Sequence, residues 1–319
     1  MKVVIDCDPG NGIPGANVDD AIALAFALRH PEIEVESIWT VFGNTSAAEG
    51  RDAAARLLRE LGARGPRLLQ GADTPLSGER AAWRSRLDAP GRSPEVCRRW
   101  GVAEPPHRYG AEAGEDPLPA LAADLLAAGD GVTLVCLGPL TNLARLLRHA
   151  PAALAGVERV CLMGGFLARN EDVDTNFAVD PHAARAVLRS GLPLTVVPLD
   201  VTRTTELSWE RWTRISAEAR ARSPEDLASI GRWLEPWLAH SSATRPVNGM
   251  WLHDLVVLAA LVEPGLVARA RRRVRTAERP PGKLLRDPEG TEVDMVTAVD
   301  NDRLVEAWAE AVLGVRSGA

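Results

Sequence analysis

Short apolar runs alternate with longer stretches of helical period along most of this chain, and this alternation limits the folds it can adopt. The apolar runs at 3–5, 35–40, 132–136, 157–162 and 194–198 are each typical of a buried strand. The stretches at 19–30, 47–61, 140–149 and 181–189 have the spacing of helices. Strand and helix in repeated alternation predict an α/β fold with a mostly parallel central sheet flanked by helices, an open sheet of the Rossmann-like type.

The middle and the carboxyl end of the chain follow this pattern less closely. Residues 77–117 have no clear period, and we expect irregular surface structure that rims the site. We predict a helical stretch at 208–240, strands at 271–275 and 291–299, and a final helix at 302–313. The sequence has no internal repeat and no linker, and 319 residues suffice for one large α/β domain. We therefore predict a single domain over 1–319, in which 208–319 completes the pocket.

Charge and cysteine content exclude several classes of function. Lys and Arg number 37 against 43 Asp and Glu, so the net charge is -6 and binding to nucleic acid is not expected. No apolar stretch approaches the roughly 18 residues that a membrane span needs. Only three apolar residues precede Asp6, too few for a signal peptide, and the 4 cysteines form no CxxC pair. We predict a cytoplasmic protein without a membrane partner.

Four carboxylates lie within fifteen residues around the end of the first predicted strand. Asp6 and Asp8 leave that strand, and Asp19 and Asp20 begin the next helix. Ligands of such sheets bind beyond the carboxyl ends of the strands. The repulsion among these acids in a partly dry site favours a bound hard cation. Alternatively, Asp19 caps the helix and Asp20 interacts with its dipole, which leaves Asp6 and Asp8 unexplained.

Further polar groups follow the other predicted strands. Asn44 comes after the second strand, where it either binds a hydroxyl-rich ligand or caps the next helix. The Gly-Pro pair after the strand at 132–136 leaves the Leu137 carbonyl free to face the site. Met163 ends the strand at 157–162, and a loop leads from it to Asp174 and Asn176, which are either ligand-binding or solvated residues.

A histidine and an acid, His253 and Asp254, begin an apolar helix near the carboxyl end. A motif this short is also typical of a capping Asp beside a buried His with no role in chemistry. Asp180, followed by Pro181, is a plain helix N-cap, and we assign it no catalytic role.

Taken together, these segments resemble the inosine-uridine preferring nucleoside hydrolase family. The matching motifs, in the order of the family, are DCDPG, DDAIAL, TVFGNT, GADTPL, GPLTNLA, MGG, DTNFAVDPHAA, PLDVT and HDLVVLA, and they span Asp6 to about Pro264. The resemblance implies the nucleoside hydrolase-like fold and a Ca²⁺-dependent enzyme that cleaves the N-glycosidic bond of a ribonucleoside into base and ribose. It also implies a homodimer or a homotetramer.

The resemblance implies a role for each matching residue. The ligands of Ca²⁺ would be the side chains of Asp8, Asp20 and Asp254 and the backbone carbonyl of Leu137. Asp19 and Asn44 would bind the ribose 2′- and 3′-hydroxyls, and Asn176 and Met163 would also bind the substrate. Asp174 would lie near the 5′-hydroxyl, at a position where the family usually has Glu. Asn170 is a second candidate for that place. Asp8 would also take the proton of the attacking water, and His253, with an ordinary pKa near 6.5, would protonate the departing base.

The sequence departs from the family pattern in two places. One residue usually separates the Gly of DCDPG from the paired aspartates, whereas residues 11–18 stand there in this chain. Thr175 precedes Asn176, a position that is often aromatic in the family. We therefore look for base-binding aromatics in Trp233, Trp237 and Trp251, which favour purine nucleosides because an indole face stacks on a flat purine. Alternatively, the first two, four residues apart, form one apolar stripe of a core helix.

Two other functions fit part of this pattern. A phosphohydrolase of the haloacid dehalogenase type also begins with Asp-x-Asp, but it needs a Thr or Val where Gly10 stands and a later phosphate-binding lysine, for which Lys283 is the only candidate. A non-catalytic protein that binds Ca²⁺ and a nucleoside or ribose on the same scaffold is the closer alternative, because the inserted loop at 11–18 could cover the site.

Overall fold

A nine-stranded sheet forms the centre of the molecule in this computed structural model, which describes residues 1–77, 85–102, 115–168 and 170–316. The strands are β1 (Lys2–Cys7), β2 (Glu34–Thr40), β3 (Arg67–Gln70), β4 (Val132–Cys136), β5 (Val157–Met163), β6 (Leu194–Val197), β9 (Val267–Thr276), β10 (Leu284–Arg286) and β11 (Thr291–Val299). Their order is β10-β9-β11-β6-β5-β4-β1-β2-β3, and among these strands the only antiparallel pairs are those that β9 forms with β10 and β11. The predicted mostly parallel sheet is therefore confirmed.

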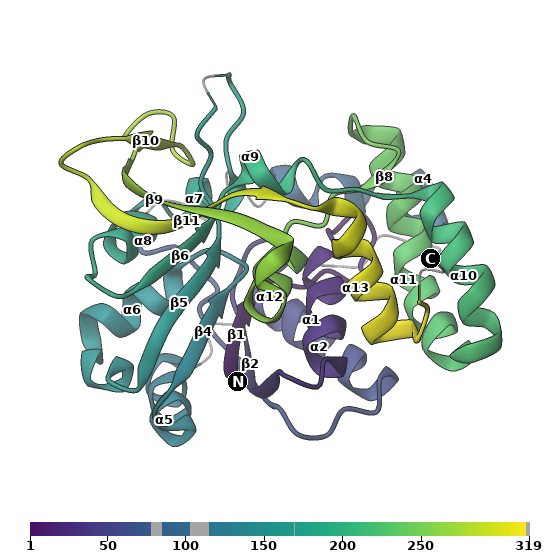
Figure 1. The fold of residues 1–319 in the computed structure, drawn as a ribbon, viewed down its shortest axis with the longest axis horizontal. Coiled ribbons are helices and arrows are strands. Elements are labelled where there is room, and N and C mark those ends of the chain that lie inside the picture. Colours follow the sequence, from purple (N-terminus) through teal and green to yellow (C-terminus); the bar gives the residue numbers. More distant parts are fainter. Residues whose placement is uncertain (78–84, 103–114, 169, 317–319) are drawn as a thin grey trace.

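Helices cover both faces of the sheet (Figure 1). On one face lie α1 (Asp19–Arg29), α2 (Ala47–Glu60), α10 (Trp209–Arg222), α11 (Pro224–Thr244), α12 (Leu255–Val262) and α13 (Asn301–Leu313). On the other lie α5 (Leu118–Ala128), α6 (Thr141–His149) and α8 (Pro181–Leu188). Side chains along β1 alternate between the two layers, since Val3 and Ile5 pack in the first core and Val4 in the second. A strand buried on both faces explains why β1 is a continuous apolar run.

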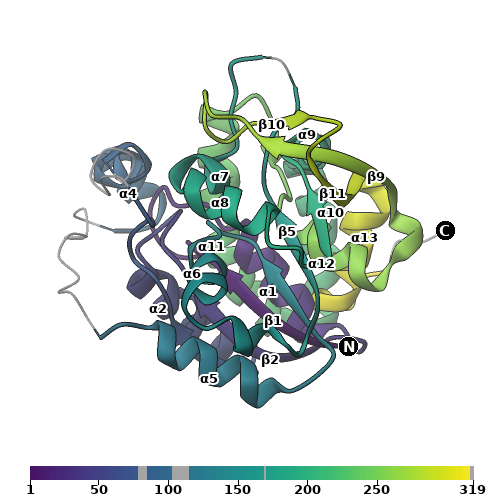
Figure 2. The ribbon, with the colours of Figure 1, turned by 90° about the vertical axis from the view of Figure 1, so that its left-hand side faces the viewer.

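Shorter elements complete the chain. They are the helices α4 (Pro94–Arg99), α7 (Thr175–Val179) and α9 (Leu199–Thr202), the 3₁₀ turns η1 (Pro90–Arg92), η2 (Pro151–Leu154) and η3 (Pro264–Leu266), and a two-stranded sheet of β7 (Leu207–Ser208) and β8 (Gly249–Met250). Seen from the side, α4 lies at the periphery, away from the central strands (Figure 2).

The parallel strands bring several predicted site segments to one edge of the sheet. Because β1 pairs with both β2 and β4 in parallel, the residues that follow these three strands emerge at the same end. Asp8 follows β1, Asn44 lies beyond the end of β2, and Leu137 follows β4. The helix α12, whose first residue directly follows Asp254, packs against α1.

The structure differs from the predictions mainly in short or apolar elements. Residues 77–117 are not wholly irregular, since η1 and α4 lie within them; parts of that segment, 78–84 and 103–114, are outside the described residues. The predicted helix over 208–240 is two helices that meet at Ser223, because Pro224 starts a second one. Within the described ranges, no helix is both long and apolar enough to cross a lipid bilayer.

Candidate active site

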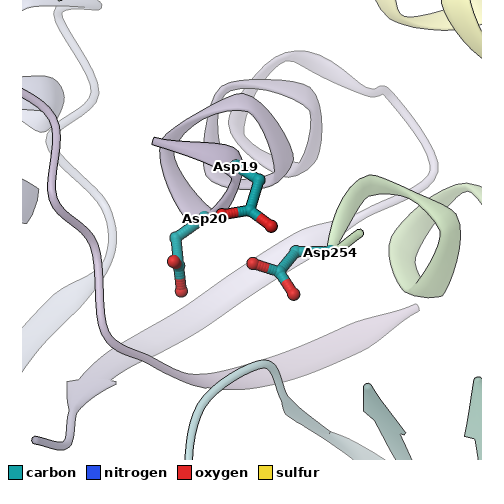
Figure 3. A group of neighbouring side chains, drawn as sticks. All are labelled: Asp19, Asp20 and Asp254. Carbon is teal, nitrogen blue, oxygen red and sulfur yellow. The ribbon is translucent and has the colours of Figure 1, made fainter. Parts of the chain in front are cut away.

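Three buried carboxylates lie together at the carboxyl end of the sheet. Asp19 and Asp20 occupy the first turn of α1, and Asp254 is the N-cap residue of α12. One ligand atom from each lies within 4.8 Å of those of the other two. Figure 3 shows how the carboxylates from α1 and from the start of α12 approach one another. Residues from distant parts of the sequence thus form one acidic group.

This group has the properties of a site for a hard cation. Among the described residues, no hydrogen-bond donor reaches Oδ1 of Asp19, although that atom is buried. Burial and the charge of Asp20 raise the pKa of Asp19 to about 8. Burial also raises the pKa values of Asp20 and Asp254. Oxygen-only ligands that repel one another when ionised are the donor set that Ca²⁺ prefers, so the residues fit such an ion.

Asp8 lies beside this group, held by backbone and amide donors. Its Oδ2 accepts a hydrogen bond from the backbone N–H of Asn44 at 2.6 Å, and its Oδ1 faces the Asn44 amide nitrogen at 3.4 Å. The backbone N–H of Asp8 donates to Oδ1 of Asp20 at 2.9 Å. Burial raises the pKa of Asp8 well above its ordinary value. The Asn44 amide also donates to Asp20, at 3.2 Å, so one side chain contacts both acids.

The carboxylate of Asp8 can lie where it does because two neighbours are glycines. A Cβ atom added to Gly43 would lie 1.6 Å from Oδ2 of Asp8, which is an impossible contact. A Cβ atom added to Gly138 would lie 3.2 Å from Oδ1 of the same carboxylate and 2.7 Å from Val41. Sequence reasoning missed this requirement, although both glycines stand in the TVFGNT and GPLTNLA motifs and could have been found there.

Asp6, the remaining member of the predicted acidic cluster, is tied to the sheet instead. Its Oδ1 accepts a hydrogen bond from the Asn142 amide at 2.9 Å, while its buried Oδ2 has no partner in the described part of the chain. Burial raises the pKa of Asp6 to about 8. Asn142 also donates to the carbonyl of Thr40 at 3.2 Å, so it bridges the ends of β1 and β2.

A cavity of about 320 Å³ opens beside the carboxylates. Ten of the predicted site residues line it: Asp8, Asp19, Asn44, Leu137, Met163, Asp174, Asn176, Trp251, His253 and Asp254. The wall contains both charged and apolar groups, which is typical of a site for a polar small molecule.

An amide side chain, Asn176, and an acid, Asp174, line the part of the cavity next to β4 and β5. Asn176 donates to the Leu137 carbonyl at 2.6 Å and to the Met163 carbonyl at 3.2 Å. The carbonyl oxygen of Leu137 has a second lone pair, so it retains the capacity to bind a cation. Asp174 is the N-cap of α7, where its Oδ1 accepts from the N–H of Phe177 at 2.9 Å. Burial raises the pKa of Asp174 to about 6.

His253 lies in the cavity wall with one ring nitrogen already bonded. Its Nδ1 is 2.7 Å from the hydroxyl of Thr202, the last residue of α9. Burial, together with the positive charges of Arg245 and Arg203, lowers the pKa of His253 to about 3. The expectation of an ordinary pKa near 6.5 is therefore wrong for this site, and its imidazole is neutral at neutral pH.

Three further predicted substrate residues lie away from the cavity wall. Trp233 and Trp237 are 2% and 1% exposed and pack in the core beside α10 and α13, as the apolar-stripe alternative predicts. Asn170 is exposed; its amide contacts Asp172, and its carbonyl accepts from Lys283. Two arginines that the sequence analysis did not single out, Arg203 and Arg245, do line the cavity. Asp180 caps α8, as predicted.

Comparison with curated proteins identifies relatives over most of the chain. The non-specific ribonucleoside hydrolase RihC of Salmonella agona is 33% identical over 272 residues, which cover 83% of this chain and 80% of that protein. The protein of the same name from Escherichia coli strain SMS-3-5 is 33% identical over 274 residues, with the same coverage.

Solved structures with the same fold cover nearly the whole chain. A purine-preferring ribonucleoside hydrolase from Gardnerella vaginalis superposes with a TM-score of 0.78 at 22% identity, covering 98% of each chain. An inosine-uridine preferring nucleoside hydrolase from Bacillus anthracis superposes with a TM-score of 0.74 at 18% identity, covering 99% of this chain and 100% of that one. A sequence model described as "Inosine-uridine preferring nucleoside hydrolase" matches residues 3–306. The chain therefore belongs to the inosine-uridine preferring nucleoside hydrolase family.

Proposed function

We propose that this protein is a Ca²⁺-dependent hydrolase that cleaves the N-glycosidic bond of ribonucleosides and releases ribose and free base. The family and the relatives named as ribonucleoside hydrolases support the reaction. The observation that carries the metal is the group of Asp19, Asp20 and Asp254, whose ligand atoms lie within 4.8 Å of one another. Three buried carboxylates at this separation need a cation to be ionised together at neutral pH.

The residues that would hold the ion are Asp20, Asp254 and Asp8, with the Leu137 carbonyl. Asp19 lies close enough to Asp20 and Asp254 that it would share the ion or bind the ribose hydroxyls beside it. The chemistry supplied by such an ion is Lewis acidity, which lowers the pKa of a water molecule and fixes the sugar diol.

The carboxylates of this chain would favour the reaction by their charge and their basicity. Cleavage of the N-glycosidic bond develops positive charge on the ribose ring, and acids around the ring stabilise that charge. Asp8 would accept the proton of the attacking water, and the contacts of Asn44 with both of its oxygens support this role by fixing the carboxylate. Asn176 would bind the opposite side of the sugar and Asp174 the 5′-hydroxyl, since both line the cavity.

We propose that His253 assists the departing base from a neutral imidazole. The contact with Thr202 engages Nδ1, so Nε2 is the nitrogen left to interact with the base. Negative charge that develops on the base during cleavage would raise the pKa of the imidazole above its resting value. The imidazole would take up a proton from solvent as its pKa rises and would pass that proton to the base, so the proton donor forms during the reaction rather than being present beforehand.

The base preference that we propose leans towards purines. Trp251 is the one predicted tryptophan among the described residues that line the cavity, so it is the candidate to stack on the base. The Gardnerella vaginalis structure, which superposes best of those compared above, is named as purine-preferring. A homodimer or homotetramer and a cytoplasmic location stay predictions.

Release of ribose from inosine, adenosine and uridine, measured as reducing sugar with and without Ca²⁺, tests this function. We expect turnover with Ca²⁺ that a chelator abolishes, and we expect Asp8→Asn to lose about 10²-fold or more in kcat because the general base is gone. Asp116→Asn, a change at an exposed surface acid, is the matched control and should keep full activity.

The non-catalytic alternative gives a different result in the same samples. A nucleoside-binding protein would bind inosine in a Ca²⁺-dependent manner by calorimetry but would release no ribose from any substrate. Turnover that persists unchanged in a chelator would contradict the metal assignment instead.

A further inference from the structure

A second, smaller cavity of about 220 Å³ adjoins the one that holds the carboxylates. The two share the wall residues Asn17, Asn44, Leu87, Thr244 and Arg245. The smaller cavity is also lined by Arg86 and His240, and none of the described residues in its wall is a carboxylate. A compartment with two guanidinium groups thus lies next to the acidic part of the site.

Arg245 is the cation that both cavities share, and its position is fixed from two sides. It is the C-cap residue of α11, where its backbone N–H donates to the carbonyl of Ser241. Its guanidinium carbon lies 4.7 Å from the centre of the Trp237 ring, a cation–π contact. Trp237 therefore supports the site from the core rather than lining it.

The guanidinium of Arg245 has hydrogen-bond capacity left for a ligand. In the part of the chain that the structure describes, no carboxylate lies within ion-pair distance of it and no acceptor is bonded to it. The other arginine of the larger cavity, Arg203, differs: its Nη1 is 2.6 Å from Asp172, and its guanidinium lies over the rings of Phe166 and Trp251. Arg203 is paired with a carboxylate of the protein, whereas Arg245 interacts with the charge of Asp19 only from beyond ion-pair distance.

The inserted loop at 11–18 forms another part of the shared wall, and it is firmly anchored. The Asn11 amide donates to the Ala53 carbonyl at 3.1 Å, and Ile13 and Ala16 pack on Ala53. Asn17 lines both cavities; its Oδ1 accepts from the N–H of Val18 at 2.9 Å. No acceptor in the described residues contacts its Nδ2, so this amide nitrogen is a donor available to a ligand.

We propose that Arg245 and Asn17 recognise the base of the substrate and select ribonucleosides whose base carries negative charge, such as the ionised dioxopurine of xanthosine. This inference rests on the proposed function. The carboxylates and Asn44 would hold the sugar, and Asn17 and Arg245 line the same cavity as well as the smaller one that adjoins it. A permanent cation and an amide N–H there stabilise an anionic base, and they also stabilise the charge that any base acquires as its bond to ribose breaks. An exocyclic amino group, as in adenosine, offers these donors no acceptor.

The test compares kcat/KM for xanthosine and adenosine, above neutral pH and with Ca²⁺, in a variant of each of the two residues. Asn17→Asp keeps the oxygen that accepts from Val18 and replaces only the amide nitrogen by a charged oxygen. Arg245→Met removes the cation and keeps an apolar chain against Trp237. The measured quantity is kcat/KM for xanthosine divided by kcat/KM for adenosine. We expect each variant to lower this ratio by about tenfold or more. Arg245→Lys should retain part of the xanthosine preference.

Arg232→Met is the matched control, because Arg232 lies on the same helix, 67% exposed and 3.6 Å from Glu60, and lines neither cavity. Its xanthosine-to-adenosine ratio should equal that of the wild-type protein. An unchanged ratio in both Asn17→Asp and Arg245→Met, or an equal loss for all nucleosides, would overturn the inference. A wild-type protein that releases ribose from no nucleoside would instead overturn the proposed function, so the two failures are distinguishable.

Discussion

The position of the Asp8 carboxylate, the proposed general base, is limited by the small space around it. Because a methyl group on Gly43 would lie 1.6 Å from Oδ2 of Asp8, the variant Gly43→Ala must displace either the carboxylate or the strand-end loop. A shift of about 1 Å in a catalytic group costs on the order of 10²-fold in rate, so we expect a loss of that size in kcat with inosine. The Ca²⁺ affinity should fall too, as a calorimetric titration would measure.

Gly65→Ala provides the comparison for that variant. A Cβ atom at Gly65 meets nothing within 4 Å, so this variant should keep wild-type activity. If Gly43→Ala were as active as Gly65→Ala, the Asp8 carboxylate would not need its observed position, and its assignment as general base would be wrong.

At the residue scale, the motifs predict Asp8, Asp20 and Asp254 at the ion and Asp19 at the sugar, and these assignments stay predictions. The structure groups Asp19, Asp20 and Asp254, whose ligand atoms lie within 4.8 Å of one another, and Asp8 lies beside them. Neighbouring residues at a helix start cannot be told apart from spacing alone, because both can face the same strand end. Arg245 was missed for a similar reason, since nothing local marks an arginine at the end of a helix as part of a site.

At the scale of the elements, a buried acid ties α5 to the sheet in addition to the apolar contacts of Leu121 and Leu125. Asp124 on α5 accepts hydrogen bonds from the Ser37 hydroxyl at 2.5 Å and the Trp39 indole at 2.8 Å, both on β2, and from Arg67 on β3. Asp124→Ala leaves the two β2 donors buried without partners, whereas the half-exposed Arg67 can turn to water. We expect a loss of about 2 kcal/mol in the free energy of unfolding, measured by urea denaturation.

Asp116→Ala removes an acid at the surface, just before α5, where it accepts hydrogen bonds from Arg145 and from the backbone N–H of Leu118. Asp116 is 57% exposed and pairs with Arg145 at 2.7 Å, and such pairs contribute less than about 1 kcal/mol. Equal destabilisation by both variants would show that the Asp124 hydrogen bonds do not anchor α5. Nucleoside hydrolysis should be unaffected by either change at a temperature where both variants are folded.

The elements that the sequence predicted well are those buried on both faces of the sheet, because continuous apolar runs such as 132–136 have few other interpretations. The missed elements lack that signal. The strand β3 is short and at the sheet edge, with polar residues at both ends, and α5 is rich in Leu and Ala on all sides, so it shows little amphipathic period. The tryptophans on α11 were correctly given a core alternative, because four-residue spacing fits one helix face.

For the whole molecule, the site depends on segments from both ends of the sequence. Asp8 directly follows the first strand and Asp19 begins the first helix, whereas His253 and Asp254 come from the segment before α12. The late strands β9 and β11 join the same sheet as β1, with β11 pairing with β6. This shared sheet supports the single domain over 1–319, which stays a prediction. Because the site residues come from distant segments, one motif alone cannot locate a site of this kind.

The metal should therefore control the stability of the whole protein, in a manner that depends on pH. Asp19 has a folded pKa of about 8, above the ordinary value near 3.9 of an unfolded chain. A raised folded pKa contributes stability that is fully present below about pH 4 and is lost as the pH rises through about 8. The metal-free protein should accordingly unfold at a lower temperature at pH 8 than at pH 5. Ca²⁺ competes with these protons for the carboxylates, and at a hundred times its Kd it stabilises the folded protein by about 2.7 kcal/mol. Because fewer protons compete at high pH, the difference in Tm between samples with Ca²⁺ and with chelator should widen from pH 5 to pH 8. Thermal scans at several pH values measure this difference, and a gap that narrows with rising pH would contradict a cation site built from Asp19, Asp20 and Asp254.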